Sequence, residues 1–149
     1  MKKILFLSMI ISLIIVSCTQ QEVKSPIEGP WQQVGYSWVS GDTITNYKLP
    51  SPDLGSQIKM WTKNYWAFMG IMKTDSSDVD LYGGGTYTLN DIEYEETIIY
   101  HNDKTNINTK FKALLELRGD TLYQTYHPVD STGKQMLNYS SIEKYIRLE

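Results

Sequence analysis

Cysteine is nearly absent from this sequence: Cys18 is the only one among 149 residues. A single cysteine excludes a disulfide within the chain, a Cys-x-x-Cys redox pair and a metal cluster built from cysteines. Histidine is also scarce, since His101 and His127 are the only two. No third ligand lies near either histidine at a spacing typical of zinc sites. We therefore expect no metal and no other cofactor.

Positive charge is sparse as well. The chain has 14 Lys and Arg residues against 17 Asp and Glu residues, which gives a formal net charge of −3. Nucleic-acid binding needs clusters of Lys and Arg to contact phosphates, and no such cluster is present. We therefore expect no nucleic-acid partner.

Long hydrophobic runs are limited to residues 4–17, which follow the basic pair Lys2-Lys3. A membrane-spanning helix needs about 20 residues, so this run is short for that role. A basic head, a short apolar stretch and a small residue before its end are typical of a secretory signal peptide.

The run ends in Ile-Val-Ser-Cys, which resembles the lipobox of bacterial lipoproteins. The resemblance implies that residues 1–17 are a signal peptide and that Cys18 becomes the mature N-terminus, carrying acyl chains such as palmitate. Several acyl chains give stable membrane anchoring where one does not. An ordinary signal peptide with a chance cysteine and a single uncleaved helix are the alternatives.

The mature chain would begin with the lipidated cysteine and a polar tether, residues 18–28. Loss of Lys2 and Lys3 leaves 12 basic against 17 acidic residues, a net charge of −5. We expect the protein to lie in the bacterial cell envelope, attached to the membrane through Cys18, with the outer membrane favoured. Thr19, Gln20 and Gln21 precede the first Glu, so an acidic surface-export signal is weak and the periplasmic or surface face stays open.

Beyond the tether the apolar residues recur with a period of two, which indicates half-buried strands. Phe111, Ala113 and Leu115 alternate with polar residues, and a short turn of helix is conceivable only over residues 52–58. Turn signals, such as Asn90-Asp91 and Gly119-Asp120, separate the alternating runs and fit tight hairpins. The expected strands are 30–39, 42–48, 56–63, 65–73, 80–89, 92–101, 106–118, 121–127 and 136–148.

Consecutive hairpins of this kind predict an all-β domain, an antiparallel up-and-down β-barrel of about eight to ten strands. Closure removes exposed sheet edges, and a barrel of about eight strands can hold one small ligand. An open sandwich is the alternative.

The stretch GPWQQV at residues 29–34 resembles the Gly-x-Trp signature of the lipocalin (calycin) first strand. The order of KMWTKNYWAFMG, GGGTYTL, YEETIIY, LRGDTLYQTY and IEKYIRLE is similar to small lipocalin-like lipoproteins of the Bacteroides group. The resemblance covers residues 29–149 and implies a lipocalin-like β-barrel with an internal cavity, but no particular ligand. It also implies that Trp31 packs under a basic residue of the last strand. Arg147 is the candidate for this structural closure.

Alternation over residues 92–100 places Glu96 on the same face as Tyr94 and Ile98, toward the barrel interior. A carboxylate there is paired, hydrogen-bonded or neutral. It is either a ligand-orienting group in a pocket or a structural Glu bonded to Tyr hydroxyls or Arg147; a register error would instead leave it in solvent. Aromatic side chains suit the walls of such a pocket. The candidate ligand-binding residues are Glu96, Tyr94, Tyr87, Trp66, Phe68, Phe111 and Tyr126.

The remaining sequence patterns do not indicate a catalytic or phosphate-binding site. Gly83-Gly84-Gly85 lacks the Lys-Ser/Thr of a phosphate-binding loop and is expected to be a bulge or bend in a strand. No nucleophile elbow is present, so no catalytic residue is assigned. Residues 61–72 are apolar on both faces of the expected strand. One face is expected to fill the barrel, and the other to lie under a loop or to contact a homodimer mate, another envelope protein or the membrane.

The sequence thus predicts a lipid-anchored binding protein for a small apolar or amphipathic ligand. A non-catalytic structural or interaction module of the envelope, with a filled core, is the alternative. An enzyme that uses Glu96 or a histidine as acid or base is a weaker one, because no second titratable group accompanies Glu96 as acid–base pairs require.

Overall fold

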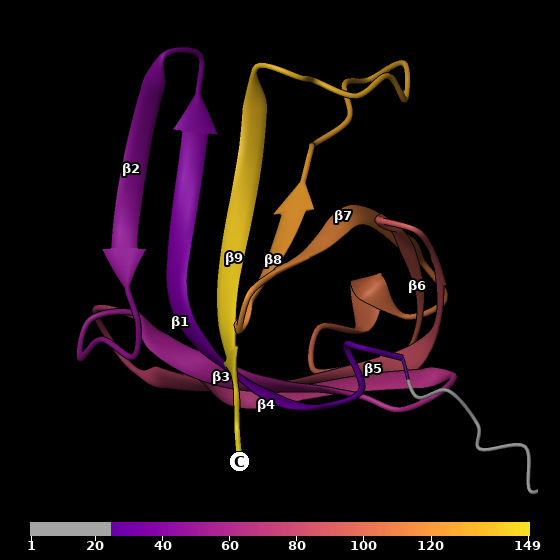
Figure 1. Ribbon diagram of the computed structural model, residues 1–149. Coiled ribbons are helices and arrows are strands. Elements are labelled where there is room, and N and C mark those ends of the chain that lie inside the picture. Colours follow the sequence, from indigo (N-terminus) through magenta and orange to yellow (C-terminus); the bar gives the residue numbers. More distant parts are fainter. Residues whose placement is uncertain (1–24) are drawn as a thin grey trace, which may run out of the picture.

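The computed structural model describes residues 25–149, so the predictions for the signal peptide and Cys18 lie outside the described residues. Antiparallel strands make up most of this part of the chain (Figure 1). They are β1 (Gly29–Ser40), β2 (Thr43–Lys48), β3 (Gly55–Trp61), β4 (Tyr65–Lys73), β5 (Asp78–Asn90), β6 (Glu93–His101), β7 (Lys110–Arg118), β8 (Thr121–Tyr126) and β9 (Tyr139–Arg147). A short 3-10 helix, η1 (Lys104–Asn106), precedes β7. No helix within residues 25–149 has the length and hydrophobicity needed to cross a membrane.

The strands form an up-and-down barrel, which confirms the predicted fold class. From β3 to β9 each strand pairs with the next, and β9 pairs with β1 to close the ring. Strand β2 is additional. The start of β1 pairs with β3 up to Gln32, and its later part pairs with β2 from Gly35 onward. In Figure 1, β1, β2 and β9 stand side by side as one tall wall of the barrel.

Tight turns form where the sequence predicts hairpins. Asp91, in the turn between β5 and β6, has a φ of 56°. Gly119, between β7 and β8, has a φ of 60°, a conformation that glycine adopts without steric cost. These turns fix the register of their flanking strands.

The three consecutive glycines lie in β5 beside a bulge, as expected, and the extra residue of this bulge is Ile99 of β6. The pairing of β5 with β6 shifts between Gly84 and Gly85. A Cβ atom on Gly85 would lie 1.9 Å from the backbone oxygen of Thr97, so no side chain fits there. The close approach of two backbones, and not phosphate binding, accounts for a glycine at this position.

Three local expectations were wrong. The strand expected over residues 136–148 begins only at Tyr139. The strand expected over residues 106–118 begins only at Lys110, because η1 occupies the preceding turn. The Asp103 side chain accepts a hydrogen bond from the Thr105 backbone nitrogen at 2.9 Å and caps this turn. The possible helical turn over residues 52–58 is absent; a turn leads directly into β3.

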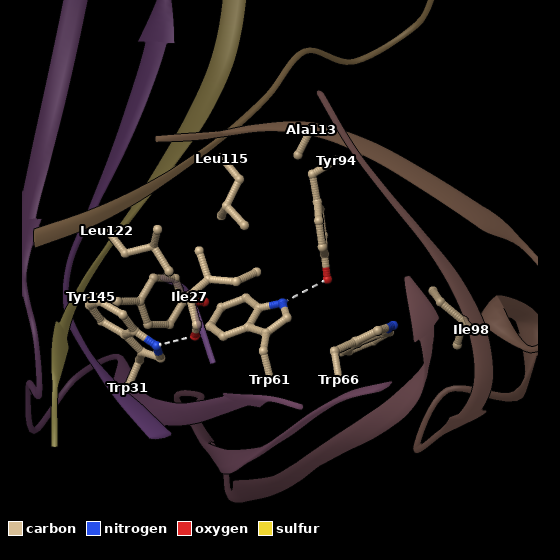
Figure 2. Packing of buried hydrophobic residues seen from close by; sticks show 10 residues of the cluster. All are labelled: Ile27, Trp31, Trp61, Trp66, Tyr94, Ile98, Ala113, Leu115, Leu122 and Tyr145. Atoms are coloured by element: carbon tan, nitrogen blue, oxygen red, sulfur yellow. Dashed lines mark hydrogen bonds between the residues drawn. The ribbon is translucent and has the colours of Figure 1, made fainter. Parts of the chain in front are cut away.

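The hydrophobic core fills one end of the barrel, which we name the closed end (Figure 2). Trp31 and Leu122 are fully buried, and the Trp61 ring meets the Tyr94 and Tyr145 rings edge to face at 6.4 and 6.1 Å between centroids. The closed end holds the start of β1, the β7–β8 turn and the end of β9. The opposite end, which holds the β1–β2 turn and residues 127–138, is named the open end.

Candidate functional site

Trp31 and Arg147 meet at the closed end. The Arg147 guanidinium carbon lies 4.2 Å from the Trp31 ring centroid, and the Trp31 Nε1 donates to the Ile27 carbonyl at 2.7 Å. Arg147 also donates to the carbonyls of Glu28 and Pro26. Ile27 is buried in the core, so residues 25–28 are fastened across the closed end. This arrangement gives Trp31 and Arg147 a structural role.

A buried ammonium group occupies the middle of the barrel. Lys59 of β3 is only 4% exposed. Its Nζ donates to Glu96 Oε2 at 3.1 Å and to Gln124 Oε1 at 3.0 Å. The rings of Trp66, Trp61 and Tyr94 surround the same nitrogen, with centroids at 4.7, 5.2 and 5.6 Å. Carboxylate, amide and aromatic faces together replace the water that Lys59 loses on burial.

Glu96 points into the barrel, as the alternation of residues 92–100 predicts, and is 5% exposed. Its Oε2 accepts from the Tyr94 hydroxyl at 2.8 Å, and that hydroxyl accepts from Trp61 Nε1 at 3.0 Å. Burial and the neighbouring Glu96 raise the pKa of Tyr94 far above its usual range, so the phenol stays a neutral donor. The cationic partner of Glu96 is Lys59, whereas Arg147 stays at the closed end with Trp31. These contacts fit the structural interpretation of Glu96.

The other aromatic candidates pack against this cluster or beside it. Trp66 and Phe68 stack with centroids 5.9 Å apart. Tyr87 lies against Tyr94 at 5.6 Å, and its hydroxyl donates to the Thr62 carbonyl at 2.7 Å. Phe111 and Tyr126 form a separate stacked pair at 4.5 Å. The seven candidates are thus brought together mainly as core.

A second interior carboxylate, Glu143 of β9, has a different environment. Its Oε1 accepts from Gln57 Nε2 at 3.3 Å and Gln33 Nε2 at 3.4 Å, and its Oε2 accepts from the Tyr145 hydroxyl at 2.9 Å. Burial raises the pKa of Glu143, against the opposing effects of Lys59 and the Tyr145 hydroxyl. Within residues 25–149 no Lys, Arg or His forms an ion pair with Glu143.

Glu143 lines a cavity of about 280 Å³. The cavity lies where β1 leaves β3, beside the segment that connects β2 to β3. One end is polar and the rest of the wall is mostly apolar. The lining residues are Gln33, Tyr36, Leu49, Leu54, Ser56, Gln57, Ile71, Met72, Leu81 and Glu143. Glu96 is not among them, so the polar group at the cavity is Glu143 and not the carboxylate that the sequence singled out.

Lys59 and Glu143 were missed because their strands show little apolar contrast between faces. In β3 the more apolar pair, Ile58 and Met60, lies on the outer face, while Gln57 and Lys59 point inward with Trp61. Alternation in the sequence does place Lys59 on the same strand face as Trp61, and Glu143 on the same face as Tyr145. It shows which way these side chains point, but not which residues they contact.

The outer surface carries exposed tyrosines over the glycine-rich part of β5. Tyr65, Tyr82 and Tyr100 are 59%, 54% and 71% exposed. They border a shallow depression of about 450 Å³ floored by Ala67 and the three glycines. Met69 and Ile71 extend this apolar surface along β4. The apolar character expected for both faces of residues 61–72 is therefore present on the outside of the barrel.

The two histidines do not approach each other in a shared site. The backbone nitrogen of Asp103 donates to His101 Nδ1 at 2.9 Å, and the His101 ring packs against Phe68. His127 Nδ1 contacts the Tyr139 carbonyl at 3.1 Å. In the part of the chain that the structure describes, no three His, Cys, Asp or Glu residues are placed to hold a metal ion.

Fold and geometry together define an antiparallel β-barrel with a filled closed end, a buried polar layer and a small cavity beside a carboxylate. No protein-family model matches the chain. No curated protein matches it either.

Proposed function

We propose that this protein is a lipid-anchored binding protein of the bacterial cell envelope that holds a small amphipathic ligand in the cavity beside Glu143. The observation that carries the proposal is the cavity itself, about 280 Å³, in which the Glu143 carboxylate and apolar side chains line the same space. Ligand sites in proteins are concave and mostly apolar, with a few placed polar groups that set orientation.

The walls and the polar end of the cavity would contact different parts of a ligand. Leu49, Leu54, Met72 and Leu81 offer an apolar surface to a hydrocarbon or aromatic body. Gln33, Gln57 and Glu143 form a hydrogen-bonded group at the polar end. A ligand with one polar head and a short apolar body matches both.

The anchoring part of the proposal rests on the Lys2-Lys3 head, the apolar run and Ile-Val-Ser-Cys. Cys18 and Ser25 are seven positions apart, a reach of at most about 25 Å for an extended chain at ~3.6 Å per residue. Because residues 25–28 cross the closed end, a lipid on Cys18 would hold that end toward the membrane. The open end would then point away from the bilayer.

Filling the cavity tests the binding proposal. In Leu81→Trp the larger side chain occupies the cavity, whereas Tyr82→Trp adds bulk on the outer face of the same strand. Titration with the neutral fluorescent probe N-phenyl-1-naphthylamine should give a Kd at least about tenfold weaker for Leu81→Trp, a loss of about 1.4 kcal/mol. Tyr82→Trp should bind like the parent protein. Equal Kd values in all three proteins would contradict the proposal.

The exposed tyrosines favour a second candidate, an interaction module of the envelope. Apolar surfaces of this kind on a barrel exterior mark contact sites. In that case Tyr82→Ala and Tyr100→Ala would abolish capture of the partner, and Leu81→Trp would leave it unchanged.

A further inference from the structure

Glu143 accepts three hydrogen bonds but forms no ion pair with any Lys, Arg or His within residues 25–149. Two side-chain amides and one phenol all donate to its oxygens, and donors of this kind favour the ionised carboxylate. The opposing influence is burial, which penalises the charge and which the more distant Lys59 offsets only in part. A cation next to Glu143 would remove that penalty and leave the three hydrogen bonds in place.

The buried ammonium of Lys59 is already paired with another carboxylate. The interior layer holds the carboxylates of Glu96 and Glu143 and the ammonium of Lys59. Lys59 Nζ is 3.1 Å from Glu96 Oε2 and 3.0 Å from Gln124 Oε1, and three aromatic rings surround it. One carboxylate is therefore left over, and it is the one at the cavity.

The surroundings of Lys59 show what an ammonium meets in this interior: a carboxylate, an amide oxygen and aromatic faces. The cavity beside Glu143 is lined by the same kinds of group. Glu143 and Gln57 lie at its polar end, and Tyr36 lines the same cavity directly across the strand pair from Glu143. The Tyr36 ring packs against Tyr47 at 6.1 Å between centroids, which holds it in place. Aromatic rings next to a carboxylate bind organic ammonium groups by combined charge pairing and cation–π attraction.

We infer that the ligand is an organic amine whose ammonium pairs with Glu143 and whose apolar body lies against Leu49, Leu54, Met72 and Leu81. This inference rests on the proposed function and adds its ligand class. An anionic ligand such as a fatty acid would bring a second negative charge to Glu143 and is disfavoured. A neutral alcohol of the same length would keep the apolar contacts but lose the charge pairing.

A matched ligand series tests the inference: hexylammonium, hexan-1-ol and hexanoate, titrated calorimetrically at pH 7.5 into the purified chain without residues 1–17. We expect hexylammonium to bind about tenfold or more tightly than hexan-1-ol, and hexanoate to bind more weakly than hexan-1-ol. Glu143→Gln should reduce the affinity for hexylammonium to that for hexan-1-ol and leave hexan-1-ol unchanged. Glu116→Gln, at an outer carboxylate already paired with Arg118, is the matched control and should bind all three ligands like the parent.

The outcomes separate this inference from the proposed function. Binding of hexan-1-ol with no advantage for hexylammonium overturns the amine assignment and keeps the cavity. Absence of binding for all three, together with no effect of Leu81→Trp on probe binding, overturns both. Should Glu143→Gln fail to fold, Tyr36→Leu serves instead: it should lower the affinity for hexylammonium selectively, and an equal loss for hexan-1-ol contradicts the inference.

Discussion

Lys59 and Glu96 form a buried ion pair whose side chains are 5% and 7% exposed. Every other ion pair within residues 25–149 has at least one partner that is much more exposed. Exposed pairs contribute little, whereas removal of one partner from a buried pair strands the other charge. At the residue scale this pair therefore controls stability more than any surface pair.

We expect Glu96→Gln to lower the free energy of unfolding by about 3–5 kcal/mol, because the buried Lys59 loses its carboxylate partner. Denaturant titration of the single variants Glu96→Gln and Lys59→Met and of the double variant measures this. The double variant should recover much of the loss, since neither position then holds an unpaired charge. Additive losses would contradict the pairing.

Trp31 supports a separate prediction at the closed end. The Arg147 guanidinium packs on the buried Trp31 ring, and the Trp31 Nε1 donates a hydrogen bond to the carbonyl of residue 27. Trp31→Ala should therefore lower the free energy of unfolding by about 3–5 kcal/mol. The outer part of β1 supplies the control, because Trp38 is 40% exposed. Trp38→Ala should change the melting temperature far less, and equal shifts for both variants would show that Trp31 does not close the barrel.

At the element scale, β5 and β6 depend on glycine for their close approach. In Gly85→Ala the added Cβ would lie 1.9 Å from the Thr97 oxygen, so the two backbones must separate. We expect a loss of about 1–3 kcal/mol, the usual range for overpacking. At Gly35, by contrast, a Cβ would meet Lys144 side-chain atoms at ordinary contact distances of 3.4 and 3.5 Å. Urea unfolding of Gly35→Ala should therefore show a smaller loss; the reverse order would contradict this account of the bulge.

Strand positions follow from the sequence because alternation and turn residues are local signals. The pattern of Phe111, Ala113 and Leu115 predicts β7 with its correct inner face. The start of β7 was misplaced because the Asp103 cap is a side-chain interaction that periodicity does not report.

The hydrogen-bond and ion-pair partners of inward-facing residues, in contrast, come from distant segments of the chain. Lys59 meets Glu96 across 37 positions, and Gln33 meets Glu143 across 110. The inward orientation of Glu96 was predictable, but its partner was not, because β3 has polar residues on its inner face. The cavity likewise depends on the point where β1 leaves β3, a tertiary feature with no marker in the sequence.

At the scale of the whole molecule, Glu143 should make stability depend on pH. Its raised pKa means that the folded state binds this proton more tightly than the unfolded state does, so stability falls as pH rises from the usual glutamate range through the raised value. The groups that influence it are Lys59, Glu96 and Tyr145. The free energy of unfolding of the parent, minus that of Glu143→Gln, should therefore decrease between pH 4 and pH 8. A difference that is constant or rises with pH would contradict the assignment.

Membrane attachment is also a property of the whole molecule. We expect Cys18→Ala to move the protein out of the membrane fraction and to block its maturation, because the acyl chains would have no attachment site. Fractionation with labelled fatty acid measures this. Equal incorporation of label into the variant and the parent protein would contradict lipidation at Cys18.

The proposed function requires that a small amphipathic ligand binds in the cavity beside Glu143, where β1 leaves β3. Backbone amide chemical shifts, recorded by NMR during titration with N-phenyl-1-naphthylamine, test it most directly because they report where the probe binds. We expect the largest shifts around Leu49, Leu54, Met72 and Leu81, which line the cavity. Shifts confined to the outer surface at Tyr65, Tyr82 and Tyr100, or no shifts at all, would contradict it.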